Sequence, residues 1–384
     1  MKKYAAIYKN ELLKEVIPFW EVHSLDIEHG GYFTCLTANG EIFDTDKFTW
    51  LQARQVWMFS KFYQVIEPKE RWREIALLGA GFLEKHGRDP LGDWYFSLNR
   101  KGQPLVQPYN IFSNCFAAMA FGTLYRITCE ERYAEIALTT FQNILKQQEN
   151  PKGTYTKTYP GTRDFQNFAL PMILCNLSME LKDLLDVGQV ERLSDMIISK
   201  IFNQFYHKES GLVLENISLE GEFIDSFEGR LLNPGHAIEA MWFIMNLGIH
   251  KKNDAMIKKA EQIMYQQLEH GWDNKHGGIF YFMDFKGYPP QQLEHDQKLW
   301  WVHLETLVAL AKTYAYNQSP KAAEWFEKVH DYTWNHFRDK EHGGEWFGYL
   351  NRQGKVNLPL KGGKWKGCFH VPRALMEVWK TLDT

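Results

Sequence analysis

The chain has 384 residues, of which 45% are apolar and 24% are charged. This composition is typical of a globular protein and excludes an intrinsically disordered chain. The 44 lysines and arginines nearly balance the 47 aspartates and glutamates, so neither nucleic acid nor an anionic membrane surface is an expected partner. No apolar stretch is long enough to span a bilayer. Aromatic residues make up 15% of the chain and include 14 tryptophans, more than core packing alone requires.

Two further features concern the cellular compartment. The first ten residues lack the uninterrupted apolar core of a signal peptide. The five cysteines are odd in number and show no CxxC spacing, which argues against a disulfide framework or a zinc site. We therefore expect a cytoplasmic protein.

A short loop pattern recurs six times along the chain. In each copy a glycine, often doubled and preceded by charged residues, leads into aromatic or branched residues. The first glycines of the copies are Gly30, Gly92, Gly153, Gly211, Gly277 and Gly343. Their near-equal spacing divides the chain into six units, so we expect one domain over residues 1–384.

Each unit combines a turn signal with helical segments. Turn dipeptides that favour β-hairpins follow most of the glycine loops, at 39–40, 101–102, 220–221, 286–287 and 353–354. Between them lie segments with apolar residues at helical spacing, such as 50–63 and 72–83. The expected fold is all-α: an (α/α)6 barrel, a closed ring of six helix pairs with short β-hairpins on the active-site face. An open solenoid is the alternative, disfavoured because neither end shows a polar capping repeat.

The helices that follow the hairpins are expected to form the inner ring. Their N-termini would then meet at one face, where free backbone N–H groups and positive dipole ends collect. The residues at these helix starts mix indole, amide and charged groups, a combination that suits a sugar site. The candidate substrate-binding residues here are Arg54, Trp57, Asn233, Glu239, Trp301 and Glu305.

Two histidines are expected at inner helix starts. His236 follows Asn233, a good N-cap, and Pro234, which suits the first helical position, while His370 lies just before Pro372. The positive helix end disfavours an imidazolium, so we expect both histidines to be neutral. Simple capping or core packing is the alternative role for each. His303, in the intervening repeat, is not excluded from the site by its spacing.

Metal and nucleotide motifs are missing. The sequence has no HExxH motif. It also has no complete P-loop, because Cys368 follows the glycine- and lysine-rich segment 362–367 at the place where the motif requires a lysine. No metal site is expected.

Several long segments resemble N-acylglucosamine 2-epimerases, a family whose mammalian member is also called renin-binding protein. They are residues 46–57, 157–163, 227–243, 300–305 and 362–373, and the likeness extends over essentially the whole chain. The resemblance implies an (α/α)6 barrel that interconverts N-acetyl-D-glucosamine and N-acetyl-D-mannosamine. It also implies a homodimer and activation by ATP that is not consumed.

The same resemblance implies site residues. The two catalytic histidines of the family match His236 and His370, and Lys157 lies in a matching segment, where we expect it to bind substrate. Related cellobiose 2-epimerases carry a further histidine one repeat before His236. Met172 stands at that place here, which argues against a disaccharide substrate.

Inverting C2 of an aldose requires removing a hydrogen from one face and returning one to the other. Two histidines on opposite faces of a planar enediol suffice for this, without a metal or redox cofactor. Arg54 is the candidate for stabilising the oxyanion at O1, unless it pairs with Asp44 or Asp46. Three other functions remain open: an aldose–ketose isomerase, a glycoside hydrolase that uses Glu239 and Glu305, and a non-catalytic sugar- or protein-binding module.

Overall fold

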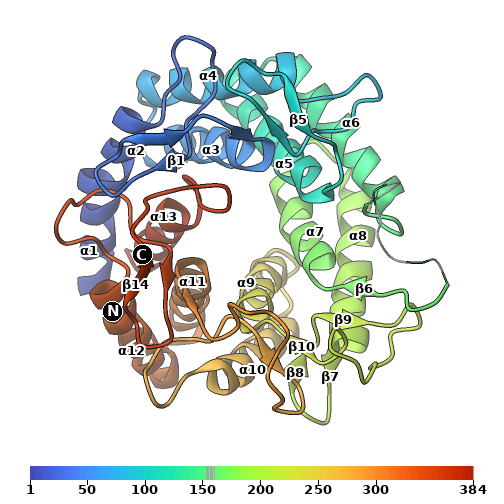
Figure 1. Ribbon diagram of the computed structural model, residues 1–384. Helices are drawn as coiled ribbons and strands as arrows, with labels where there is room; N and C mark the ends of the chain where they lie inside the picture. Colours follow the sequence, from blue (N-terminus) through green and yellow to red (C-terminus); the bar gives the residue numbers. More distant parts are fainter. Residues whose placement is uncertain (153–154, 156–158, 160, 384) are drawn as a thin grey trace.

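The helices form two concentric rings (Figure 1) in a computed structural model that describes residues 1–152, 155, 159 and 161–383. The inner ring consists of α3 (Thr49–Lys61), α5 (Ile111–Thr128), α7 (Ala169–Glu180), α9 (Pro234–His250), α11 (Trp300–Asn317) and α13 (His370–Leu382). The outer ring consists of α1 (Lys2–Glu11), α2 (Ile17–His23), α4 (Glu70–His86), α6 (Glu131–Gln147), α8 (Val187–Lys200), α10 (Asp254–Gly271) and α12 (Pro320–His336). The helices that follow the hairpins are the inner ones, as predicted.

The ring closes where the two ends of the chain meet. α1, at the start of the chain, packs against α13, at its end. Trp57 of α3 contacts Phe369, just before α13, with ring centroids 5.5 Å apart. A β-bridge also joins Thr37 to Leu360. The closed (α/α)6 barrel is therefore confirmed and the open solenoid was the wrong alternative.

Inner and outer helices differ in sequence because they differ in burial. Every residue of α5 from Ser113 to Leu124 is buried, as expected for a helix that is apolar on all sides. In the outer helix α6 the buried residues, such as Tyr133, Ile136, Ala137 and Ile144, lie on one face only. The inner helices therefore form the core, and the outer helices cover it. No helix in the described part of the chain is long and apolar enough to cross a membrane.

Short strands connect neighbouring repeats on the hairpin face. The strands are β1 (Cys35–Leu36), β2 (Ile42–Asp44), β3 (Lys47–Phe48), β4 (Ser97–Leu98), β5 (Pro104–Val106), β6 (Gln166–Asn167), β7 (Tyr206–His207), β8 (Leu212–Val213), β9 (Asn216–Ile217), β10 (Leu231–Leu232), β11 (Met283–Asp284), β12 (Lys298–Leu299), β13 (Tyr349–Leu350) and β14 (Val356–Leu358). The strands that enter α3, α7, α9 and α11 each pair with a strand of the following repeat: β3 with β4, β6 with β9, β10 with β11 and β12 with β13.

Three of the five predicted hairpins are confirmed. The turns at 39–40, 101–102 and 353–354 connect the antiparallel pairs β1–β2, β4–β5 and β13–β14. The turns at Gly221 and Gly287 also form, with backbone hydrogen bonds to Ser218 and Asp284. The hairpin prediction was wrong at these two turns, because in the described chain β9 and β11 pair with strands of the preceding repeats instead.

A buried ion pair recurs beneath the hairpins. Lys47 contacts Asp26 at 2.8 Å, with both side chains fully buried, and Arg100 of the next repeat contacts the same carboxylate at 3.0 Å. Equivalent pairs join Lys298 to Asp273 and Lys361 to Asp339. These pairs hold the strand that enters an inner helix against the preceding glycine loop.

Lys47→Met is expected to lower the free energy of unfolding by about 3 kcal/mol, since removing one partner of a buried pair leaves the other uncompensated. Burial raises the pKa of Asp26, but hydrogen bonds from Arg100 and Lys47 outweigh it and lower the pKa to about 2. The ion pair between Lys47 and Asp26 therefore stabilises the fold above the ordinary pKa of aspartate, and this contribution is lost as the pH falls toward 2 and Asp26 gains a proton. Urea unfolding at pH 7 measures the effect. Equal midpoints for Lys47→Met and the exposed control Lys101→Met would contradict it.

Candidate active site

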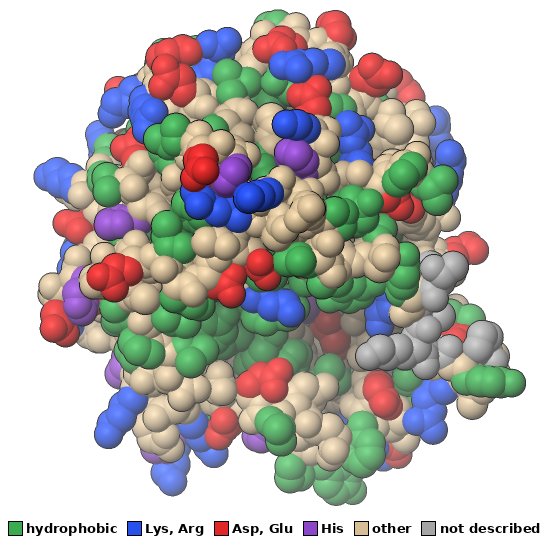
Figure 2. Space-filling model, turned by 45° about the horizontal axis from the view of Figure 1, so that its top comes forward, with side chains coloured by type: hydrophobic (Ala, Val, Ile, Leu, Met, Phe, Trp, Pro, Cys, Tyr) green, Lys and Arg blue, Asp and Glu red, His purple; other side chains and the backbone are tan. Residues whose placement is uncertain are grey.

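The predicted histidines lie at the helix starts on the hairpin face, which is hollowed (Figure 2). α13 begins at His370. His236 is in the first turn of α9, where Asn233 is the N-cap: its side-chain oxygen accepts a hydrogen bond from the His236 backbone N–H. The capping chemistry read from the sequence is confirmed, and it places both imidazoles at the N-terminal end of the inner ring.

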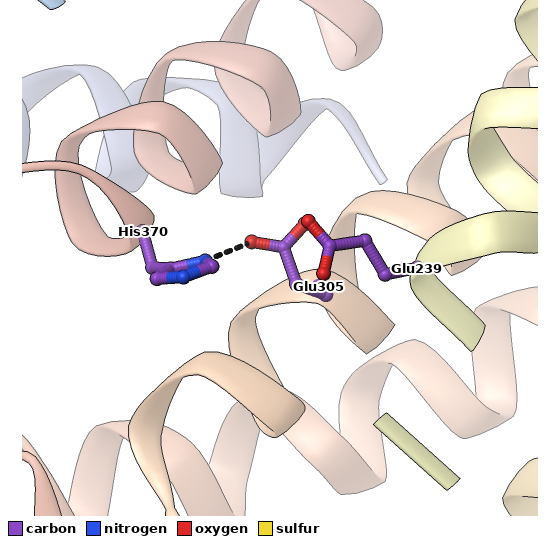
Figure 3. Close-up of side chains that lie close together, drawn as sticks. All are labelled: Glu239, Glu305 and His370. Carbon is purple, nitrogen blue, oxygen red and sulfur yellow. Dashed lines mark hydrogen bonds and ion pairs between the residues drawn. The ribbon is translucent and has the colours of Figure 1, made fainter. Parts of the chain in front are cut away.

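His370 is held by a carboxylate from the neighbouring helix (Figure 3). Its Nδ1 lies 2.8 Å from Oε1 of Glu305, whose other oxygen accepts a hydrogen bond from the Trp242 indole at 3.0 Å. With the carboxylate as acceptor, Nδ1 carries the proton and Nε2 keeps the lone pair of a base. Burial, with the nearby charges of Arg54 and Arg373, lowers the pKa of His370 well below its ordinary value. His370 is therefore neutral at pH 7.

His236 has its own carboxylate partner, Glu215. Nδ1 of His236 lies 3.0 Å and 3.2 Å from the two oxygens of Glu215. Burial lowers the pKa of His236, but the charge and hydrogen bond of Glu215 outweigh it, so the pKa is raised. The pKa of His236 is therefore shifted in the direction opposite to that expected from the helix dipole. The pKa of His370 is lowered and that of His236 is raised, so His370 is suited to act as a base and His236 as an acid.

Sequence reasoning missed Glu215. It lies 21 residues before His236, in one of the weaker copies of the repeat, and no local motif marks it. Glu239, which is a substrate-binding candidate by sequence, lies three positions further along the same helix. In the structure Glu239 instead forms an ion pair with Arg373.

Trp301 lies between the two histidines. Its ring centroid is 5.2 Å from that of His236 and 5.9 Å from that of His370. These two distances together place the imidazoles at most about 11 Å apart. The structure therefore brings His236, His370 and Trp301 together at one site.

Arg54 is buried in the site and forms no ion pair with a carboxylate in the part of the chain that the structure describes. Its guanidinium contacts the rings of Phe116, Trp50 and Phe369 at 3.9, 4.3 and 4.5 Å. Among the described residues its buried Nε has no hydrogen-bond partner, and it forms no pair with Asp44 or Asp46. Burial and the charge of Arg373 lower the pKa of Arg54 to about 9, so the side chain is still charged at pH 7. It is available for a developing anion.

Glu239, Glu305 and His370 form a cluster whose ligand atoms lie within 4.8 Å of one another (Figure 3). Such a set could hold a divalent cation. Arg373 already occupies this position, since its guanidinium contacts Glu305 at 2.7 Å and also contacts Glu239. The chemistry of the donor set is therefore that of a buried ion-pair network.

Two other candidates, Trp57 and His303, lie elsewhere. Trp57 packs under Phe369, and its indole donates a hydrogen bond to Glu180 at the far end of α7. Lys157 lies outside the described residues. His303 is fully buried: its Nε2 accepts the Ile279 N–H at 2.9 Å, and burial lowers its pKa to about 3. His303 is thus a core residue.

The chain resembles known proteins over almost its whole length. Residues 31–374 match the family model of N-acylglucosamine 2-epimerase (GlcNAc 2-epimerase). The N-acylglucosamine 2-epimerase of Bos taurus is 40% identical over 375 residues, covering 94% of this chain and 87% of the relative.

Two solved structures share the fold. Cellobiose 2-epimerase from Bacillus thermoamylovorans superimposes with a TM-score of 0.85 at 22% identity, covering 99% of this chain and 100% of the other. A D-mannose isomerase gives a TM-score of 0.84 at 17% identity, with 98% of each chain covered. With the sequence match at this length and identity, the chain belongs to the N-acylglucosamine 2-epimerase family.

Proposed function

We propose that this protein interconverts N-acetyl-D-glucosamine and N-acetyl-D-mannosamine by moving a proton at C2 of the open-chain sugar. One observation carries the proposal: two histidines with separate carboxylate partners and opposite pKa shifts flank the same indole. The relatives named N-acylglucosamine 2-epimerase support the choice of an N-acylated amino sugar.

The first step is removal of the C2 hydrogen. This hydrogen is acidic only next to a carbonyl, so the sugar ring opens to the aldehyde before the step. The neutral His370 takes the proton through Nε2, and the electron pair of the C–H bond forms a C1–C2 double bond while negative charge develops on O1, which gives an enolate. The Glu305 carboxylate stabilises the imidazolium that forms.

The second step returns a proton to the other face of C2. The intermediate carries negative charge at O1, and the unpaired guanidinium of Arg54 is the group that stabilises it. The protonated His236 then donates to C2, and the electron pair returns to restore the aldehyde. The reverse reaction uses the same pair with exchanged roles.

The proposal is tested by incubating N-acetyl-D-mannosamine with the protein in D2O and following the products by ¹H NMR. N-acetyl-D-glucosamine with deuterium at C2 is the expected product, because the acid returns a solvent-derived proton. A product that keeps the original C2 hydrogen would argue for hydride transfer. A ketose formed from D-mannose, which carries a hydroxyl group at C2, would identify an aldose–ketose isomerase, and binding without any exchange would identify a sugar-binding module. Release of reducing ends from an oligosaccharide would identify a glycoside hydrolase.

Glu215→Gln is expected to shift one limb of the pH–rate profile. Turnover needs one proton on the histidine pair, so activity falls at low pH when His370 gains a proton and at high pH when His236 loses its proton. Glu215 raises the pKa of His236, so its replacement moves the alkaline limb to lower pH. The acid limb, set by His370, is the internal control. An unchanged alkaline limb would contradict the role of Glu215.

We further propose the wider setting of this activity. Residues 1–384 act as a single catalytic domain in a cytoplasmic homodimer that takes part in amino-sugar metabolism, and Lys157 belongs to the substrate site. No cofactor is consumed, and ATP acts as an activator. The resemblance of the long sequence segments to the family supports these statements.

A further inference from the structure

A second cavity lies at the opposite end of the inner ring. Its volume is about 430 Å³, and its walls include Trp57, Asn176, Trp242, Asn246, Arg373 and Glu377. Asn246 follows His236 by ten residues on α9, which corresponds to about 15 Å along the helix axis. The exposed side chains of Lys182, Ile249 and His250 lie at its rim. The cavity therefore opens away from the hairpin face, with the Glu239–Arg373–Glu305 network between it and the histidines.

The polar groups of this cavity have unused hydrogen-bonding capacity. Asn176 is only 8% exposed, and its side chain has one partner in the described chain, the sulfur of Met119 at 3.6 Å. The Asn246 side chain has no partner among the described residues, and the buried Nε of Arg373 has none either. Asn246 is partly exposed, whereas Asn176 and Arg373 are buried. Buried polar groups are normally satisfied, so the Asn176 amide and the Arg373 guanidinium point to a polar ligand.

The charges of the inner wall of the cavity are already compensated, whereas Lys182, at the exposed rim, has no ion-pair partner among the described residues. Glu180 is paired with Lys61 at 3.1 Å, and Glu377 with Lys312 at 2.8 Å. Arg373 is neutralised by Glu239 and Glu305. Among the described residues no unpaired charge is thus left in the inner wall for a phosphate or an ammonium group, which favours a neutral ligand.

The indoles of Trp57 and Trp242 supply the remaining surface. Aromatic faces bind the C–H face of a sugar ring, while amides bind its hydroxyl groups, and a volume of this size suits a small molecule. We propose that this cavity is a second binding site, for a neutral ring of monosaccharide size that carries several hydroxyl groups.

Such a ligand would touch groups that also shape the active site. Trp242 donates its indole N–H to Glu305, and Arg373 bridges Glu305 and Glu239. Glu305 in turn holds Nδ1 of His370. Occupancy of the second cavity is therefore expected to change the turnover number of the enzyme.

Equilibrium dialysis of the full chain with radiolabelled N-acetyl-D-glucosamine, and separately with D-glucose, counts the sites. This count does not depend on turnover, so it stands apart from the proposed reaction. We expect the wild-type chain to bind two equivalents of at least one of these sugars. The double variant Asn176→Leu/Asn246→Leu is expected to bind one equivalent of the same sugar. The exposed control Asn203→Leu is expected to keep both equivalents. Thermal unfolding verifies folding, and Asn246→Trp, which fills the cavity from its rim, serves as the second variant.

Three results would overturn the proposal. One is a single equivalent of each sugar on the wild-type chain. Another is a second equivalent that persists in both cavity variants, which would place it elsewhere. The third is a second equivalent found only with inorganic phosphate and lost in the variants, which would show that the site takes an anion.

Discussion

His370→Asn and His236→Asn are each expected to lower kcat for epimerisation by about 100- to 10,000-fold, the usual contribution of a general acid or base. Asparagine can still donate a hydrogen bond to Glu305 or Glu215, so the loss reports proton transfer rather than collapse of the site. Assay of kcat in both directions measures the effect. His276→Asn, in a loop on the same face, is the matched control and is expected to keep wild-type activity.

The two variants are also expected to differ from each other in solvent exchange. In a two-base mechanism each histidine removes the C2 hydrogen of one epimer, so each single variant still exchanges the hydrogen of the epimer whose base it retains. NMR in D2O with each pure sugar distinguishes them. Equal residual exchange of both epimers by both variants would contradict the assignment of one histidine to each face.

Arg373→Met is expected to lower the free energy of unfolding by about 3–5 kcal/mol, the cost of leaving a buried charge uncompensated. Arg373 is 2% exposed and is the guanidinium shared by Glu239 and Glu305. Burial lowers the pKa of Arg373, but these two carboxylates outweigh it and raise the pKa. The substitution is also expected to abolish most activity, because Glu305 positions His370.

Urea denaturation measures this effect, with two comparisons. Arg132→Met removes an exposed arginine that pairs with Glu84 and Glu130, and such surface pairs contribute about 1 kcal/mol or less. Adding Glu239→Gln to Arg373→Met removes one of the orphaned charges and is expected to recover part of the lost stability. If Arg373→Met and Arg132→Met lose equal stability, the network does not have the role given to it here.

The architecture could be predicted from local signals. The six glycine loops, the helical spacing of apolar residues and the turn dipeptides all act over a few residues, so they are readable in the chain itself. Asn233 and Pro234 placed His236 at a helix start by their own capping chemistry. The same reasoning failed at Gly221 and Gly287, since a turn dipeptide specifies a turn but not the strand with which its flank pairs.

The sequence by itself determined the repeat, the closed ring of helices and the face on which His236 and His370 lie, because periodicity and capping are local. Only the tertiary structure decided which carboxylate each histidine contacts. Glu215 reaches His236 from the segment between β8 and β9, and Glu305 reaches His370 from the neighbouring helix, across 65 residues of chain. Partners this distant are chosen by the packing of the inner ring. Glu215 raises the pKa of His236, whereas burial and the charges of Arg54 and Arg373 lower the pKa of His370.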